Sequence, residues 1–240
     1  MNKRCFRHLL FLGCLSVCLF ITMSCGLDVI SVVLDDYVSE VSEQPIESSL
    51  FADRSFVFHT RKLDNANDLG HGYVYYKIYN KLSVANTETS VLTTLIEDAA
   101  NKQNSFSRLE SYGFKELRVK NGTNFSTVQF ENEVHTIDIR LTNYSAEFNA
   151  HVIVDGTNTG VPVRTNGNTF DFGRHGENDK VPLETDDDTK NFTTRTIEDP
   201  DLYYVSLYSV FMMYDEQYEP VFSPIHYLGT VKIDPTSESN

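Results

Sequence analysis

The sequence predicts a mainly β fold. Aromatic side chains are abundant, with 13 Tyr and 16 Phe, whereas Trp is absent. Thr, Val and Asn are frequent, and long runs of apolar residues at helical spacing are few. Aromatic and β-branched side chains favour strands because they pack well on a pleated surface. We therefore expect an antiparallel β-sandwich that carries an inserted short helical segment and extra hairpins.

The first 24 residues have the pattern of a signal peptide. Three basic residues precede residues 9–21, an apolar stretch that is too short for a comfortable membrane span. Cys25 follows directly, within Ser24-Cys25-Gly26. In a bacterial lipoprotein such a cysteine receives palmitate-type acyl chains, and several chains at about 0.8 kcal/mol per buried methylene make a stable anchor. The sequence therefore predicts lipidation at Cys25 and a place in the bacterial cell envelope, on the periplasmic leaflet or the outer-membrane surface.

Two alternatives to lipidation at Cys25 remain open. Phe11-Leu12-Gly13 before Cys14 is a competing match, but cleavage there would leave only a few apolar residues in the leader. A secretory signal cleaved near Ser24 would instead leave Cys25 as a free thiol, which is a liability in an oxidising compartment. Because all four cysteines lie in the first 25 residues, no disulfide can stabilise the rest of the chain.

Charge limits the partners that the sequence allows. The formal net charge is −14 at pH 7, and the leader contributes only basic groups, so its removal makes the chain more acidic. An acidic chain repels nucleic acid and anionic lipid surfaces. We therefore expect no nucleic acid partner, and contact with a membrane only through N-terminal acyl chains.

The chain is expected to contain one folded domain. Its predicted segments are the signal peptide 1–24, the lipidated Cys25 with a first strand and a tether in 25–50, a single β-sandwich domain in 51–233 with an insertion at about 83–199, and a flexible tail at 234–240. A domain of this length can bury enough apolar surface to fold without disulfides. The first strand is expected near residues 29–34, although residues 27–41 also have a helical 3-4-3-4 spacing of apolar groups.

Alternation of apolar and polar residues predicts the strands of the body. The clearest strand is Tyr73–Tyr79, in which Val74, Tyr76 and Ile78 share one face. Further strands are expected at residues 56–60, 114–120, 123–130, 134–141, 148–154, 202–213 and 224–233. Asn121-Gly122 predicts a tight turn that pairs 114–120 with 123–130, because both turn residues must accept positive φ.

Two segments depart from the β pattern. Between Thr87 and Tyr112, apolar residues recur at helical spacing and predict a helical hairpin or a broken helix that ends at Gly113. Residues 155–199 are poor in large apolar groups, which predicts a long, partly mobile loop. Its acidic run Glu184–Asp188 is interpreted as solvated, and calcium binding is an open alternative although the run lacks the spacing of a calcium loop.

Local motifs for catalysis do not occur in the sequence. The histidines lack the short pairing of zinc motifs, and there is no Gly-x-Ser-x-Gly elbow or phosphate-binding Gly-rich loop. We therefore expect a protein that is not an enzyme and assign no catalytic residue, metal ligand or cofactor.

Tyrosines form the candidate binding surface. Tyr73, Tyr75 and Tyr79 share one face of their strand, and Tyr204 and Tyr208 share one face of a later strand. Tyr supplies rigid contact area with a polar tip, which suits a protein or glycan ligand. The alternative is that these rings pack beneath the helical segment.

Two family resemblances extend these expectations. The approach to Tyr203, with Ile197 six residues before it and an alternating strand after it, resembles a fibronectin type III or immunoglobulin-like sandwich. That resemblance implies that Tyr203 is a corner tyrosine whose hydroxyl bonds to upstream backbone. The set Ser24–Asp28, Phe56–Phe58, Gly72–Tyr79 and the late Tyr-rich strand resembles a group of treponemal (spirochaete) exported lipoproteins. It implies a lipid-anchored, exported β-sandwich and carries no catalytic residue across.

The function that the sequence favours is that of a lipid-anchored, non-catalytic binding or adhesion module. The leader, the body without cysteines and the two tyrosine-rich strands lead to this interpretation. Alternatives are a structural or assembly subunit of an envelope complex, or a periplasmic ligand-binding protein.

Overall fold

The computed structural model describes eight stretches of the chain. They are residues 38–41, 50–60, 71–97, 104–120, 134–172, 181–190, 202–214 and 218–234. Contacts divide the chain into two units, Met1–Val32 and Val33–Asn240, and every described residue belongs to the second. The leader, Cys25, and the strands expected near residues 29–34 and 123–130 therefore lie outside the described residues.

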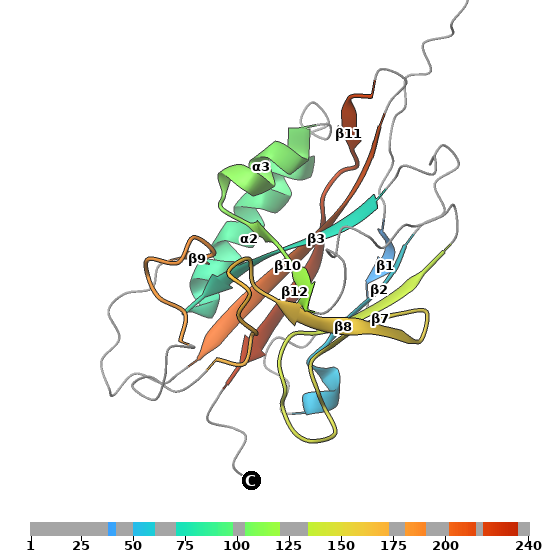
Figure 1. Ribbon diagram of the computed structural model, residues 1–240. Helices are drawn as coiled ribbons and strands as arrows, with labels where there is room; N and C mark the ends of the chain where they lie inside the picture. Colours follow the sequence, from blue (N-terminus) through green and yellow to red (C-terminus); the bar gives the residue numbers. More distant parts are fainter. Residues whose placement is uncertain are drawn as a thin grey trace, which may run out of the picture. The chain divides into compact units, whose positions relative to one another are not determined.

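The described chain is mainly β, as the sequence predicts, and forms two antiparallel sheets (Figure 1). The β2 sheet has the order β1-β2-β6-β7-β8-β5. Its strands are β1 (Val38–Val41), β2 (Phe56–Thr60), β6 (Thr136–Arg140), β7 (His151–Val154), β8 (Thr157–Val163) and β5 (Arg118–Lys120).

The β10 sheet has the order β11-β10-β3-β4, with β12 also paired to β10 and β9 paired in parallel to β3. Its strands are β11 (Pro220–Phe222), β10 (Tyr203–Tyr214), β3 (His71–Tyr79), β4 (Lys115–Glu116), β12 (His226–Ile233) and β9 (Thr189–Lys190). The long alternating runs that the sequence predicts as its clearest strands therefore lie next to each other, as β3 and β10.

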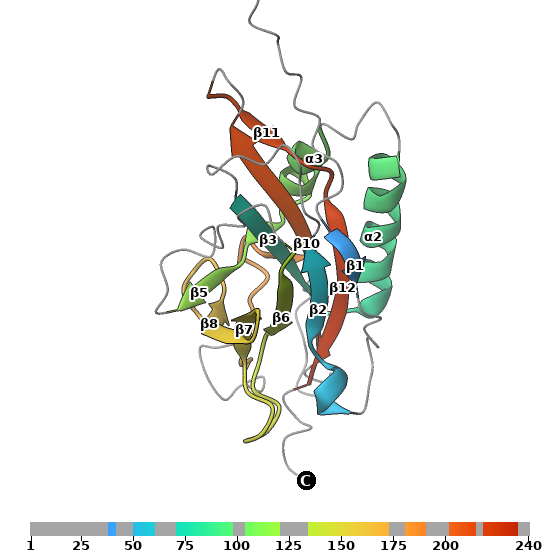
Figure 2. The same cartoon turned by 90° about the vertical axis from the view of Figure 1, so that its right-hand side faces the viewer.

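Helices α2 (Leu82–Glu97) and α3 (Ser105–Ser111) cover one face of the β10 sheet (Figure 2), and a short 3-10 helix, η1 (Phe51–Asp53), precedes β2. Leu92 of α2 and Leu109 of α3 pack against Tyr208 and Val210 of β10. After α3 the chain turns at Gly113, whose φ of +78° is in the left-handed region that ends many helices. The expected helical segment is confirmed, because its apolar residues at helical spacing cover the sheet.

The other face of the β10 sheet is apolar and buried. The register places Val205 opposite Ile78 and Leu207 opposite Tyr76, and all four are buried. Phe170, in the segment after β8, packs edge-on against Tyr76 with 5.0 Å between ring centroids. On the β2 sheet, alternating residues are likewise buried, namely Phe56, Phe58, Ile137, Ile139 and Val152. This arrangement is consistent with a β-sandwich, and the finer fibronectin type III or immunoglobulin-like class stays a prediction.

One short segment belongs to both sheets. β4 pairs with β3, and β5, which begins two residues after β4 ends, pairs with β8. Between them Leu117 is fully buried, and its amide donates to the carbonyl of Val74 at 2.8 Å. Residues 114–120 are thus extended as expected, with β3 and β8 as their described partners.

Four strands of the described chain lie where the sequence predicts none. Residues 155–199 contain β8 and β9 together with buried Phe170 and Phe172, so the prediction of a long loop is wrong for these parts. β1 lies within the predicted tether, and β11 lies between the predicted strands 202–213 and 224–233. β1, β9 and β11 are short, and the first residues of β8 are exposed, so none of the four has the alternation of apolar and polar residues that marks a half-buried strand.

Gly160 occupies a position in β8 that has no room for a side chain. A Cβ atom there would lie 2.5 Å from Cγ1 of Val119 and 2.9 Å from the carbonyl oxygen of Lys120, at a φ of +140°. Gly156, in the turn before β8, has a φ of +79° but no atom within 4 Å of such a Cβ. Substitution of Gly160 therefore introduces both steric crowding and backbone strain, whereas substitution of Gly156 introduces backbone strain alone.

Replacement of Gly160 should destabilise the protein more than replacement of Gly156. We expect Gly160→Ala to lower the free energy of unfolding by roughly 3 kcal/mol, because strain and overpacking combine. Gly156→Ala is the matched control and should cost about 1 kcal/mol from backbone strain alone. Urea denaturation measures both, and equal losses would contradict the close approach of β8 to β5.

Candidate functional site

The predicted tyrosine surface is divided in the structure. Tyr79 is fully buried beneath α2, as are Tyr204 and Tyr208 of β10. These three rings belong to the interior, so the prediction that Tyr79 contributes to an open binding surface is wrong. Tyr73 and Tyr75 are half-buried and pack at the border of the core beneath the helices. The reason is that α2 and α3 extend over only part of this face.

A buried carboxylate lies beside Tyr79. Glu88 of α2 accepts a hydrogen bond from the Tyr79 hydroxyl at 2.5 Å and ion-pairs with Lys77 at 3.3 Å and with Lys190 of β9. Lys77 also donates to the carbonyl of Tyr112. Burial lowers the pKa of Lys77, and the charge of Glu88 opposes this effect. Burial and then Glu88 raise the pKa of Tyr79, so its hydroxyl remains a donor at neutral pH.

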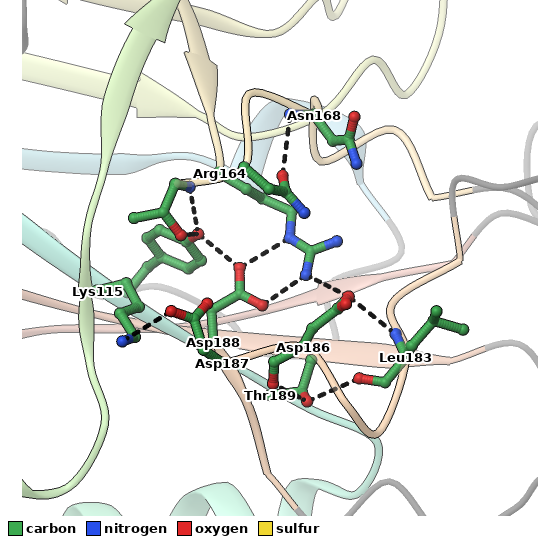
Figure 3. Close-up of polar contacts among 11 residues, drawn as sticks. Lys115, Arg164, Asn168, Leu183, Asp186, Asp187, Asp188 and Thr189 are labelled. Atoms are coloured by element: carbon green, nitrogen blue, oxygen red, sulfur yellow. Dashed lines mark hydrogen bonds and ion pairs between the residues drawn. The ribbon is translucent and has the colours of Figure 1, made fainter.

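A second buried charge cluster is centred on Arg164, which follows β8 (Figure 3). The guanidinium is bidentate to Asp188, with Nε 2.8 Å from Oδ2 and Nη2 2.5 Å from Oδ1. It also donates to Asp186 at 2.7 Å, and the Tyr76 hydroxyl donates to Asp188 at 2.6 Å. Burial by itself lowers the pKa of Arg164, but the hydrogen bonds and charges of Asp188 and Asp186 raise it above its ordinary value.

The chain around these aspartates is held by its own hydrogen bonds. Leu183 donates its amide to the Asp186 carboxylate at 3.0 Å, and the Thr189 hydroxyl donates to the Leu183 carbonyl at 2.9 Å (Figure 3). The amide of Ile78 in β3 donates to the Asp188 carbonyl at 2.9 Å. Local turn bonds thus shape the segment, and the backbone of β3 fixes its position.

The acidic run is solvated only in part: Glu184, Thr185 and Asp187 are exposed as the sequence predicts, whereas Asp188 is buried and Asp186 is half-buried. Asp188 is 1% exposed and Asp186 contacts the guanidinium, whereas the Asp187 side chain is 69% exposed and pairs with Lys115 at 2.9 Å. The sequence contained no local sign of this arrangement, because Arg164 lies 24 residues before its partner Asp188.

These side chains form a balanced network. Four basic and four acidic groups take part, namely Lys77, Lys115, Arg164, Lys190, Glu88, Asp186, Asp187 and Asp188. The Arg164 guanidinium lies between the carboxylates of Asp186 and Asp188, and it occupies the position that a bound cation would take. Among the described residues there is no group of three or more His, Cys, Asp or Glu side chains that could hold a metal ion. The ion pairs of this network connect β9 and the residues just before it to β3, β4, α2 and the segment after β8.

Histidines on the β2 sheet face carboxylates. His151 Nε2 lies 3.2 Å from Asp138, and His135 Nδ1 lies 2.6 Å from Asp155. The register places His59 opposite Thr136, with His59 Nδ1 3.0 Å from the Thr136 hydroxyl. Burial by itself raises the pKa of Asp138, but the neighbouring His151 lowers it below its usual value. The hydrogen bond to His135 lowers the pKa of Asp155 in the same way.

The chain was also compared with known proteins. No protein-family model matches it, and neither a curated protein nor a solved structure matches it. The helices in the described part of the chain are not long and apolar enough to cross a membrane.

Removal of Arg164 should destabilise the fold strongly. We expect Arg164→Met to lower the free energy of unfolding by about 3–5 kcal/mol, because it leaves the buried Asp188 charge without its cation. Lys115→Met is the matched control, since it breaks a solvent-exposed pair with Asp187 and should cost at most about 1 kcal/mol. Urea denaturation distinguishes the two variants, and equal losses would show that the buried pair contributes no more than the exposed one.

Stability should fall in acid through Asp138 and Asp155. Their folded pKa values lie below the ordinary value of about 4, so their contribution is complete above that pH and is lost as the pH falls through the folded values. Asp138→Asn should lower the free energy of unfolding at pH 7 and flatten its decline below about pH 4. Urea denaturation at a series of pH values measures this profile.

The control for this pH profile is Glu147→Gln, which removes an exposed carboxylate on the segment between β6 and β7. Its profile should run parallel to that of the wild type. A decline for Asp138→Asn as steep as the wild-type decline would contradict the role assigned to the His151 contact.

Proposed function

We propose that the protein is a lipid-anchored protein of the bacterial cell envelope that acts as a non-catalytic binding or adhesion module. The observation that carries this proposal is the placement of the cysteines. All four precede residue 26, and the last follows a basic and apolar leader in Ser24-Cys25-Gly26. A thiol at that position is chemically suited to acylation, and acyl chains would hold the domain at a membrane surface.

The described body supports a binding role rather than a reaction. Four of its buried charges lie in ion pairs between elements, namely Arg164 with Asp188 and Lys77 with Glu88. Each of these charges is neutralised by its partner and serves to position strands and helices. Tyr73 and Tyr75 instead keep part of their rings accessible at the border of the helices. Half-exposed aromatic rings on a rigid sheet are well suited to protein or glycan contacts.

The finer assignments made from the sequence belong to this proposal as well. An immunoglobulin-like or fibronectin type III topology agrees with a mainly β body made of two sheets, and the spirochaete origin rests on the resemblance of the sequence alone. Tyr203, the proposed corner tyrosine, begins β10 and packs edge-on against Phe172 at 4.9 Å between ring centroids.

Labelling with radioactive palmitate tests the anchor. The full chain expressed in a bacterial host with lipoprotein processing should incorporate label, and Cys25→Ala should lose it. Cys14→Ala and Cys18→Ala are matched controls that should keep the label, because their cysteines lie within the apolar leader. Fluorography of the purified chain, with mass spectrometry of its N-terminus, gives the readout.

Equal labelling of the wild type and Cys25→Ala would remove the anchor from the proposal. A partner recovered in stoichiometric amounts from solubilised envelope would favour the alternative of an assembly subunit. Binding to an external protein or glycan, without such a resident partner, agrees with an adhesion or binding module.

A further inference from the structure

The helix-side face of the β10 sheet ends in a group of aromatic and acidic residues. Register and alternation place Tyr73 and Tyr75 of β3, Glu116 of β4 and Phe222 of β11 on this side. Phe106 of α3 joins them, and Figure 2 shows α3 near β11 and the adjoining end of β10. We call these five half-buried residues the aromatic–acidic face.

The rings of this face are in mutual contact. Phe106 stacks on Phe222 with 4.1 Å between ring centroids, and Tyr75 meets Phe106 edge-on at 5.4 Å. Tyr75 lies directly opposite Glu116 in the register of β3 and β4, and the Glu116 charge acts on both Tyr73 and Tyr75. Glu110, exposed on α3, adds a second carboxylate that acts on Tyr75. Aromatic rings and carboxylates are therefore combined within one surface.

The same strand contains an internal version of this combination. Four residues along β3, Lys77 lies 5.5 Å from the centre of the Phe114 ring and 6.0 Å from that of Tyr79, and it pairs with Glu88. At this internal position the cation that contacts the rings and the carboxylate is Lys77, a residue of the chain itself. Lys190 does the same over the ring of Tyr112, at 5.8 Å.

The charged groups around the aromatic–acidic face are of both signs, since Glu116 and Glu110 are acidic and Arg118 and the exposed Arg108 of α3 are basic. The attraction of a cation therefore rests on Glu116 itself and on the acidity of the whole chain. Lys115, next to Glu116, pairs with Asp187 on the opposite side of the sheet. The charge of Arg118 acts on Glu116, but its guanidinium also donates to the carbonyl of Thr165 at 3.4 Å. The whole chain has a net charge of −14, which attracts basic partners over a distance.

We propose that the aromatic–acidic face binds a cationic protein segment, with a Lys or Arg side chain over the rings of Tyr73 and Tyr75 and its charge beside Glu116. This inference rests on the proposed binding function and names the partner's chemistry. An ammonium or guanidinium group is attracted by the negative face of an aromatic ring, and a neighbouring carboxylate strengthens that attraction. A glycan would use the rings but would gain nothing from the acidity of the whole chain.

The test uses the full chain in a non-ionic detergent, with tyrosine rings labelled with ¹³C. The probe is a capped octapeptide of alternating Gly and Arg, and the comparison probes are the same peptide with Glu in place of Arg and a neutral hexasaccharide. Tyrosine ring resonances are followed by NMR during each titration. The Arg peptide should shift the resonances of Tyr73 and Tyr75, with affinity that falls as salt rises, and the Glu peptide should not bind.

Variants identify the groups that carry the binding. Tyr73→Ala should weaken the Arg peptide about tenfold, whereas Tyr73→Phe should retain binding because the ring supplies the attraction. Glu116→Gln should weaken binding about fivefold, and the control Glu147→Gln on the other sheet should leave it unchanged. The urea midpoint of each variant shows whether it is folded, and Tyr73→Phe keeps the test valid if Tyr73→Ala is not.

Several outcomes would overturn the inference. Equal binding of the Arg and Glu peptides, or an unchanged affinity in Glu116→Gln, would show that charge complementarity does not operate here. Binding of the hexasaccharide in place of the Arg peptide would also overturn it, while leaving the proposed binding function intact. Loss of palmitate labelling concerns only the anchor and is recorded in a separate experiment.

Discussion

The buried ion pair between Arg164 and Asp188 is the contact on which the arrangement of the described body depends most. Charges that leave water are costly unless hydrogen bonds satisfy them fully. Asp188 is met by two guanidinium nitrogens and by the Tyr76 hydroxyl, and on the other side of β3 Glu88 is met by Lys77, Lys190 and Tyr79. β3 therefore lies between two charge clusters, one with two cations around Glu88 and one with two carboxylates around Arg164, and these clusters fix its position relative to α2, β9 and the segment after β8.

The parts of the fold that could be predicted are those with a local pattern. β3 alternates along its length, β10 is a long run of apolar and aromatic residues, and α2 has helical spacing, so each was visible in the sequence. β8 could not be found, because its first residues are exposed and polar and the strand is held by backbone bonds to β7 and β5. Backbone pairing does not require particular side chains. A strand that is held mainly by backbone hydrogen bonds therefore cannot be recognised from the pattern of its residues.

The candidate site shows the same limit. Sequence alternation placed Tyr73, Tyr75 and Tyr79 on one face, which the structure has, but it could not say how far the helices extend over that face. Helix packing decides this, since Ala85 of α2 packs with the buried Tyr79, whereas Tyr73 lies at the border of the cluster around Leu92 and Leu109 and stays partly accessible. The role of Asp188 was hidden for a related reason, because its partner Arg164 is distant in the chain and nothing local marks the pair.

The pairing of β3 also sets the order in which the chain can fold. Ile78 pairs with Thr189 and Tyr79 pairs with Tyr204, so more than one hundred residues separate the members of each pair. A sheet built from such distant contacts forms slowly, because the entropy cost of closing long loops comes before the stabilising contacts form. During synthesis β3 therefore remains without these two neighbours until most of the polypeptide has been made, and a chain in that state exposes apolar surface that chaperones bind.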